Sequence, residues 1–583
     1  MREPTNAVEV ERDVKVTMPD GVVLLTDVYH PVGVGDAPTI LERTPYGRAG
    51  VATMAGPEFA ARGYRYVLQA CRGTDGSGGS HSYFAEAADG RATADWIAGQ
   101  AWFDGRLGSY GASYMGFTQW ALASTRPPWL QAMAIALSTS VRSFSWYPGD
   151  SLALEVIVPW DLGALQFNKP ANRPVVDDVS AEAVERRMAE LQTAFLHLPL
   201  GDVLRATAGE DLPLFQDQLE HASARDPFWA DIDFRRFLAD WTVPTLLVDG
   251  WHDYPLPGVC DDYAAIRAAG APVRLRIGAG GHLGGGGEGG MTDAPLDWFD
   301  TYLLGKPELL ARPLPSRPVA VHVQGVGGTW RDLDDWPPPA SAPTRWYLHG
   351  GGRLSTSPPA AASEPDRYHY DPADPTPSVG GIGMLTGGPR DNRALEARAD
   401  VVVYTSDALA EPLELVGPVH AELFVSSSLE HTDFFVRVCD VYPDGRSVNV
   451  CDGLQRFDPS TIDRGPDGTF RARVRVWPIG HRFAAGHRLR VQVSSGAHPV
   501  YARNLGTGEP PATATAMRAA DQAVFHDPDR PSSVTLPVFG PGGPSLVEEV
   551  AAERGFGRER TTGTLAADDR PERDQHDDRT DDL

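Results

Sequence analysis

The sequence predicts an α/β domain with a parallel sheet, a helical insertion within it, and a separate all-β domain. Three observations predict this. Before about residue 140, short apolar runs alternate with segments of helical periodicity, which is typical of βαβ units. Between about Val141 and Trp241 the strand signal stops, which indicates a helical insertion. After about Pro313, many short alternating runs follow one another between Gly, Pro and Asp clusters, as in a β-sandwich or jelly roll.

The length of the chain also requires several domains. Its 583 residues exceed one ordinary core, because most domains hold about 100 to 200 residues. With 42% hydrophobic and 22% charged residues, the composition is that of a globular protein. We expect the α/β domain in residues 1–140 and 242–312, a helical cap in 141–241, a jelly-roll β-sandwich in 313–552, and a disordered charged tail in 553–583.

The first element is an antiparallel hairpin. Residues alternate from Val8 to about Tyr29, and the segment Pro19-Asp20-Gly21 in the middle is a turn signal. Such a hairpin suits the edge of a sheet. The expected strands that follow are PTILERTPY, YRYVLQAC, GRLGSYG and LQAMAIAL, and the expected helices are EAADGRATADWIAGQ and YMGFTQWALAS.

The insertion interrupts the sheet and does not end it. Its segment SAEAVERRMAELQTAFLHL carries Ala, Glu, Arg and Leu at helical spacing, and the β signal then returns with VPTLLVDG and PVRLRIG. We therefore expect the insertion to lie over the sheet as a cap. The expected strands of the last domain include PVAVHVQG, TRWYLHG, DVVVYTS, HAELFVSS, DFFVRVCDVY, FRARVRVWP and RLRVQVSS.

The net charge argues against polyanionic partners. A formal charge of −26 would repel nucleic acid and anionic membranes, which are bound through clustered Lys and Arg. No apolar stretch near the N-terminus resembles a signal, and no later run reaches the roughly 18 apolar residues of a membrane span. We expect a cytoplasmic protein. The four cysteines form no C-x-x-C pair, which indicates reduced thiols and neither a disulfide framework nor a zinc site.

A candidate nucleophile lies between a short strand and a helix. In GRLGSYGASYMGF, Ser113 follows Gly111 by two residues, as in a nucleophile elbow. Small neighbours are needed there because the serine occupies a strained turn, and the following helix N-terminus favours developing negative charge. The usual G-x-S-x-G motif is altered, since Met115 stands at the second glycine position and Gly116 follows it. Taken alone, the segment is equally compatible with a simple turn.

The partners of a catalytic serine occur in the order that α/β-hydrolases use. A serine hydroxyl needs a histidine to remove its proton, and the histidine needs a carboxylate to orient it. Asp253 follows the strand VPTLLVDG, and His282 follows PVRLRIG, so both lie beyond strand ends in the order Ser, Asp, His. Asp249 lies inside the predicted strand, and His252 points away from its neighbour if the turn is tight. Each residue alone fits a cap or a surface role; their joint order favours a triad.

Two groups are candidates for holding an oxyanion. The backbone N–H of Tyr114, directly after the nucleophile, is the expected first donor. Tyr46 lies after the strand PTILE, where α/β-hydrolases supply their second donor. A tyrosine that simply packs beside Pro45 is the alternative interpretation.

Five motifs together resemble the CocE/NonD hydrolases, the group of cocaine esterase and X-Pro dipeptidyl peptidase. The resemblance runs from about Val10 to about Pro537. Its motifs are R-x-P-Y at Arg43 to Tyr46, R-G-x-x-x-S-x-G at Arg72 to Gly79, D-W-I at Asp95 to Ile97, G-x-S-Y-x-G at Gly111 to Gly116, and G-W-x-D at Gly250 to Asp253.

The resemblance implies both a fold and a site. It implies an α/β-hydrolase fold with an inserted helical cap and a C-terminal jelly roll, and a triad of Ser113, Asp253 and His282 without metal or cofactor. It also implies that the Tyr46 hydroxyl and the Tyr114 amide hold the oxyanion. The chain departs from the family before and after His282, where GAGGHLGGGGEGG replaces a turn that commonly contains Trp.

The substrate is predicted less directly. Family members that act on α-amino esters carry extra carboxylates after the triad Asp, and a buried ammonium needs such partners. Tyr254, Pro255 and Leu256 stand there instead, which disfavours a free α-amine. A small, largely apolar acyl group is the expected substrate part. The aromatic residues predicted to line its pocket, for which core packing is an equal explanation, are Trp146, Tyr147, Trp160, Phe167 and Trp251.

Several alternatives remain open at this point. The same triad would serve an X-Pro dipeptidyl peptidase, an amidase or an acyltransferase, and the oligomeric state, a homo-oligomer included, is not determined by any motif. The alternative from another class is an inactive carbohydrate-binding or scaffolding protein, because jelly rolls often bind sugars and a hydrolase fold can lose its activity. The intact set of Ser, Asp, His and Tyr favours a serine hydrolase that cleaves a small ester, or an amide, through an acyl-enzyme.

Overall fold

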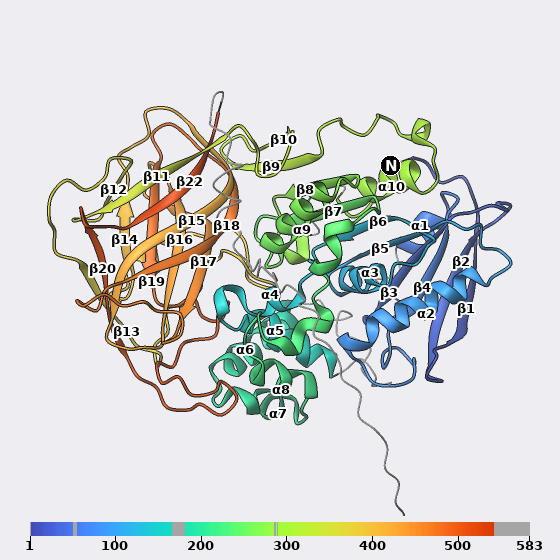
Figure 1. Cartoon of the computed structure of the whole chain (residues 1–583), viewed down its shortest axis with the longest axis horizontal. Coiled ribbons are helices and arrows are strands. Elements are labelled where there is room, and N and C mark those ends of the chain that lie inside the picture. Colours follow the sequence, from blue (N-terminus) through green and yellow to red (C-terminus); the bar gives the residue numbers. More distant parts are fainter. Residues whose placement is uncertain (1, 50–54, 166–180, 285–286, 288–289, 541–583) are drawn as a thin grey trace, which may run out of the picture.

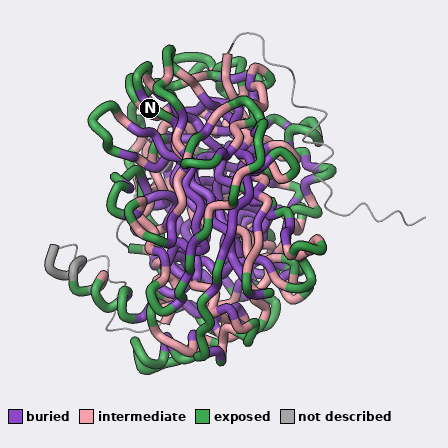
Figure 2. The backbone as a smooth tube through the Cα atoms, turned by 90° about the vertical axis from the view of Figure 1, so that its left-hand side faces the viewer, coloured by how far each residue is buried: buried purple, intermediate pink, exposed green. Residues whose placement is uncertain are grey.

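The computed structural model describes residues 2–49, 55–165, 181–284, 287 and 290–540. An α/β part and a β-sandwich lie side by side, and a group of helices lies below the junction between them (Figure 1). In Figure 2, buried backbone runs through the middle of the molecule and exposed backbone is concentrated at the outer turns. Phe167 and the predicted tail, residues 553–583, lie outside the described residues.

The sheet of the α/β part has an antiparallel edge and a parallel centre. The hairpin predicted at the N-terminus is confirmed, with Val8 paired to Pro31 and Thr17 to Val23. The strands pair in the order β1-β2-β4-β3-β5-β6-β7-β8-β9, and every pair from β4 to β9 is parallel. Their bounds are β1 Val8–Thr17, β2 Val23–Pro31, β3 Thr39–Thr44, β4 Arg65–Ala70, β5 Leu107–Ala112, β6 Leu130–Ala136, β7 Thr245–Gly250, β8 Val273–Gly278 and β9 Val319–Gly325.

Helices cover both faces of this sheet. Successive strand residues point to opposite faces, so Ile40 and Leu246 enter one apolar cluster while Leu41 and Leu247 enter the other. Burial on both faces explains why the strands read as continuous apolar runs. The helices on one face are α2 (Glu86–Ala98), α3 (Tyr114–Ser124) and α9 (Leu256–Ala269), and those on the other are α1 (Ala55–Ala60) and α10 (Asp293–Tyr302).

The described part of the segment between β6 and β7 is helical and contains no strand, as its periodicity predicts. The long amphipathic stretch forms α6, which runs from Ala181 to Leu196. The other helices of this segment are α4 (Arg142–Trp146), α5 (Leu154–Ala164), α7 (Val203–Ala208) and α8 (Pro213–Glu220). In Figure 1 these helices lie beside the carboxyl ends of the central strands and against the sandwich.

The C-terminal part is an antiparallel β-sandwich, as predicted. One set of strands pairs in the order β11-β22-β15-β18, and another in the order β14-β19-β16-β17. The bounds are β10 Thr329–Leu333, β11 Ser341–His349, β12 Arg353–Ser355, β13 Asp366–Tyr370, α11 Arg393–Glu396, β14 Val402–Thr405, β15 Leu413–Ser427, β16 Thr432–Val441, β17 Ser447–Phe457, β18 Phe470–Phe483, β19 Arg488–Ser494, β20 Ala520–Asp527, β21 Arg530–Pro531 and β22 Ser533–Phe539.

One strand belongs to both parts of the molecule. Leu275 to Ile277 of β8 pair with Val319 to Val321 of β9, whose far end pairs in parallel with His481 and Arg482 of β18. The two sheets are therefore hydrogen-bonded to each other through β9. We propose the domain divisions 140/141, 241/242 and 312/313 as the limits of the three folded parts.

Three further features follow from the described residues. No helix among them combines the length and hydropathy that crossing a bilayer requires. No group of three His, Cys, Asp or Glu side chains in the same residues is arranged to hold a metal ion. The four cysteines are buried and are not joined in disulfides.

Candidate active site

Ser113 occupies the sharp turn between β5 and α3. Its backbone has φ 56° and ψ −121°, a conformation that few residues other than glycine adopt. The neighbours must be small here: a Cβ on Gly111 would lie 2.5 Å from that of Met115, and one on Gly116 would lie 2.5 Å from that of Ser138. This crowding explains why glycines occupy positions 111 and 116. It also explains why the second glycine of the motif can stand at position 116, directly after Met115. The turn places Ser113 at the carboxyl edge of the sheet.

The structure brings Ser113, His282 and Asp253 together. The Nε2 atom of His282 lies 2.9 Å from the Ser113 Oγ, and its Nδ1 atom lies 2.9 and 3.1 Å from the two Asp253 oxygens. Asp253 follows β7 and His282 follows β8, so neighbouring parallel strands deliver both side chains to the same edge. The arrangement can move a proton from the serine hydroxyl to the imidazole while the carboxylate holds Nδ1–H.

Burial sets the charge states in this group. Loss of solvent lowers the pKa of His282 to about 4, against the opposing effect of the Asp249 carboxylate. The same burial raises the pKa of Asp253 to about 7, although hydrogen bonds from Asp249 and the Tyr254 amide oppose the rise. The imidazole is thus neutral at neutral pH and available as a base. Asp249 itself lies within β7, as predicted, and is fully buried.

The two predicted oxyanion donors lie on the elements that the sequence indicates. Tyr114 is the first residue of α3, where a helical amide has no acceptor within its own helix. Tyr46 follows β3 and is half-buried, and its hydroxyl accepts a hydrogen bond of 3.4 Å from the Trp160 indole.

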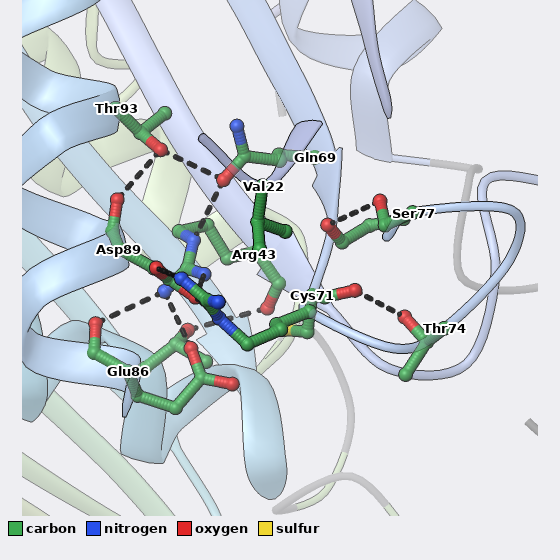
Figure 3. A network of polar contacts seen from close by, with 12 residues as sticks. Val22, Arg43, Gln69, Cys71, Thr74, Ser77, Glu86, Asp89 and Thr93 are labelled. Carbon is green, nitrogen blue, oxygen red and sulfur yellow. Dashed lines mark hydrogen bonds and ion pairs between the residues drawn. The ribbon is translucent and has the colours of Figure 1, made fainter. Parts of the chain in front are cut away.

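A buried polar network connects the segments that carry these donors (Figure 3). Arg43, at the end of β3, donates through Nη1 to Glu86 Oε2 at 2.5 Å and through Nε to Gln69 Oε1 at 2.8 Å. The phenol of Tyr114 donates to the other oxygen of Glu86 at 2.9 Å. Glu86 therefore connects the strand before Tyr46 with the residue after Ser113. The motif at Arg43 hinted at this role, whereas no sequence signal pointed to Glu86 or Gln69.

The predicted pocket residues occupy different environments. Trp160 stacks on Tyr114 with ring centroids 5.7 Å apart and lies at the site. Trp146 is buried against Tyr83, from the segment before α2, whereas the Tyr147 phenol donates to the Gln218 carbonyl at 2.7 Å and packs within the cap. The structure does not bring Trp251 to the triad, because its indole donates to the His322 carbonyl at 2.6 Å and its ring lies against Gly480 of β18.

Three residues near the triad were not predicted as site residues. The ring of Tyr254 packs on that of His282, with centroids 4.7 Å apart. Met384, from the sandwich, packs against the apolar cluster that contains Tyr254. Arg142, the first residue of α4, is buried beside Tyr254 and affects the pKa of His282. An arginine within the otherwise apolar and small segment VRSFSWY was the available signal for the last of these.

Comparison with known families matches both halves of the chain. Residues 20–284 match the family described as X-Pro dipeptidyl-peptidase (S15 family), and residues 314–535 match its C-terminal non-catalytic domain. The chain is 33% identical to cocaine esterase from Rhodococcus sp. (strain MB1 Bresler), over 91% of this chain and 98% of that protein.

Solved structures give the same architecture. An α-amino acid ester hydrolase is 25% identical and superposes with a TM-score of 0.76, over 91% of this chain and 97% of that one. An aminopeptidase from a marine sediment archaeon (Thaumarchaeota archaeon) has the same TM-score at 24% identity, with 91% and 96% of the chains covered, and shows the shared fold alone.

Proposed function

The chain belongs to the CocE/NonD family of serine hydrolases, which cleave ester bonds, and from that premise we propose Ser113 as its nucleophile. The observation that carries this proposal is the continuous contact from Ser113 Oγ through His282 to Asp253. The fold, the mechanism class and a small-molecule ester or peptide substrate follow from family membership. The roles of individual residues and the acyl group are the parts that we propose.

In the proposed mechanism, His282 Nε2 takes the Ser113 proton as Oγ attacks the substrate carbonyl carbon. Asp253 accepts the Nδ1–H bond and stabilises the imidazolium. The tetrahedral oxyanion receives hydrogen bonds from the Tyr46 hydroxyl and the Tyr114 amide, worth about 3 to 4 kcal/mol each. His282 then gives the proton to the leaving alcohol, which departs as the acyl-enzyme forms. A water that loses its proton to His282 hydrolyses the acyl-enzyme and restores Ser113.

We propose an ester with a small acyl group as the substrate. Tyr254, Pro255 and Leu256 follow the triad Asp, so this segment provides no carboxylate to hold a substrate ammonium. The rings of Trp160 and Tyr114 supply an apolar wall at the site. An X-Pro dipeptidyl peptidase is the second candidate, and the matched family description favours it.

The proposal is tested by labelling with a fluorophosphonate, followed by intact-protein mass spectrometry. We expect one adduct on the wild type, none on Ser113→Ala, and strongly slowed labelling of His282→Ala. Steady-state rates on a 4-nitrophenyl ester and on an X-Pro anilide then separate the two candidates. An adduct that persists in Ser113→Ala would overturn the assignment of the nucleophile, and faster turnover of the anilide would favour the peptidase.

A further inference from the structure

Arg142 lies beside the proposed triad. Its guanidinium carbon is 5.5 Å from the centroid of the Trp146 ring and 5.8 Å from that of Tyr83. The guanidinium also lies next to the Tyr254 hydroxyl, and the Tyr254 ring packs on His282. One tyrosine ring therefore separates Arg142 from the imidazole that contacts Ser113. Its charge acts on Asp253 as well as on His282.

This cation has no anionic partner in the described part of the chain. Arg142 is 3% exposed, its Nε has no hydrogen-bond partner, and no carboxylate forms an ion pair with it. Other buried arginines differ: Arg43 is paired with Glu86 at 2.5 Å and Arg437 with Asp452 at 2.9 Å. A buried charge without a partner is strongly unfavourable, so an unpaired guanidinium at a reactive centre indicates that a ligand supplies the anion.

Two more polar groups next to Arg142 also lack partners. The Tyr83 hydroxyl and both carboxyl oxygens of Asp161 in α5 are buried and form no hydrogen bond of good geometry with a described residue, and Arg142 is the cation nearest to them. Burial raises the pKa of Asp161 well above its usual value, with Arg142 opposing the rise, which favours the neutral acid. The Arg142 guanidinium and the Tyr83 hydroxyl are the hydrogen-bond donors of this cluster.

We propose that this cluster binds a carboxylate on the acyl part of the substrate, and that the enzyme hydrolyses monoesters of short dicarboxylic acids. The inference rests on the proposed role of Ser113. A planar guanidinium binds a carboxylate through two parallel hydrogen bonds, and the neighbouring Tyr83 hydroxyl can add a third. The single ring between Arg142 and His282 favours a short diacid, in which a few methylene groups cross the aromatic wall of Trp146 and Tyr83.

The test compares two substrates that differ in one group. In 4-nitrophenyl glutarate a carboxylate replaces the terminal methyl of 4-nitrophenyl pentanoate. We expect the wild type to favour the glutarate in kcat/KM, and Arg142→Met to lower the glutarate value about 10- to 100-fold while changing the pentanoate value less than about threefold. Arg142→Lys should recover part of the preference. The exposed Arg126, paired with Asp240, provides the matched control Arg126→Met, which should leave both values unchanged.

Two further measurements keep the inference separate from folding and from the proposed triad. Fluorophosphonate labelling reports whether Arg142→Met retains a working Ser113, and free glutarate should inhibit the wild type competitively where pentanoate does not. An unchanged substrate ratio in labelled Arg142→Met, or absence of glutarate inhibition, overturns the inference and leaves the triad intact. A preference for 4-nitrophenyl 5-aminopentanoate that Asp161→Asn abolishes would also overturn it, since Asp161 would then bind a cation. Loss of all labelling in Ser113→Ala tests the nucleophile alone.

Discussion

Two regions that flank Ser113 each bury an arginine, and they treat it in opposite ways. In β3, Arg43 donates to Glu86 and Gln69 (Figure 3), and the Tyr114 hydroxyl donates to the same Glu86. Each guanidinium has one nitrogen without a hydrogen bond, but Arg43 is ion-paired with Glu86, whereas no described carboxylate forms an ion pair with Arg142 in the cap. Satisfied networks rigidify a site, whereas unsatisfied groups are stable only if something else completes them. We therefore propose that the first region supports the segments around the nucleophile and that the second recognises the substrate.

The largest effect should come from breaking the satisfied region. Glu86→Ala leaves the Arg43 charge buried without its main partner, and we expect the free energy of unfolding to fall by about 3 to 5 kcal/mol. Chemical denaturation followed by fluorescence measures this. Arg142→Met, which removes a charge that has no partner, should cost less than about 1 kcal/mol. If the free energy of unfolding fell equally in the two variants, the proposed difference between a paired Arg43 and an unpaired Arg142 would be wrong.

Tyr46 lies where the two regions meet. It follows the strand of Arg43, and its hydroxyl faces Trp160 of the cap. Tyr46→Phe removes an oxyanion donor, and we expect kcat to fall about 100- to 1,000-fold with little change in KM or in stability. Steady-state kinetics on a 4-nitrophenyl ester checks this. A change confined to KM would place Tyr46 in substrate binding and not in the oxyanion hole.

A pair of tyrosines gives a smaller and direct comparison. The Tyr114 hydroxyl donates to Glu86, while the Tyr83 hydroxyl, also buried, has no partner. Tyr114→Phe should therefore lower the free energy of unfolding by about 1 to 3 kcal/mol, because it removes a hydrogen bond to a charged group. Tyr83→Phe should leave stability unchanged or raise it slightly. If Tyr83→Phe were as destabilising as Tyr114→Phe, the Tyr83 hydroxyl would form a hydrogen bond that the structure does not show.

The smallest expected effect is on the pH dependence. Burial raises the pKa of Asp253 to about 7, and uptake of this proton weakens the base, so kcat/KM should rise as the pH increases through about 7. The positive charge of Arg142 lowers the pKa values of both His282 and Asp253. Its removal in Arg142→Met should move the acid limb upward by about half a pH unit. A downward shift would contradict the placement of this charge beside the triad.

The fold and the order of the candidate triad were both accessible from the sequence. Alternation predicted the hairpin from Val8, and parallel strands that end at one edge predicted that the residues after β5, β7 and β8 would meet. These predictions rest on local periodicity and on chain order, which a sequence carries directly.

Contacts between distant elements were not accessible in this way. The bond between Tyr114 and Glu86 joins two helices, and no local pattern specifies it. Trp251 was expected at the pocket, yet its ring packs where Gly480 of the sandwich leaves room for it. The direction of a side chain in a turn depends on the tertiary neighbours, which periodicity does not describe.

The strand β9 joins the α/β sheet to the sandwich by backbone hydrogen bonds. It closes one edge of the α/β sheet and pairs with β18, whose Trp477 donates a hydrogen bond of 3.0 Å to the Asp253 carbonyl. The sandwich therefore contacts the turn of a proposed catalytic residue through the Trp477 side chain, and it is joined to the α/β sheet through the pairing of β9. If the N-terminal half folded alone, the edge strand β8 of its sheet would have no pairing partner. We therefore expect each half to require the other for a complete native fold.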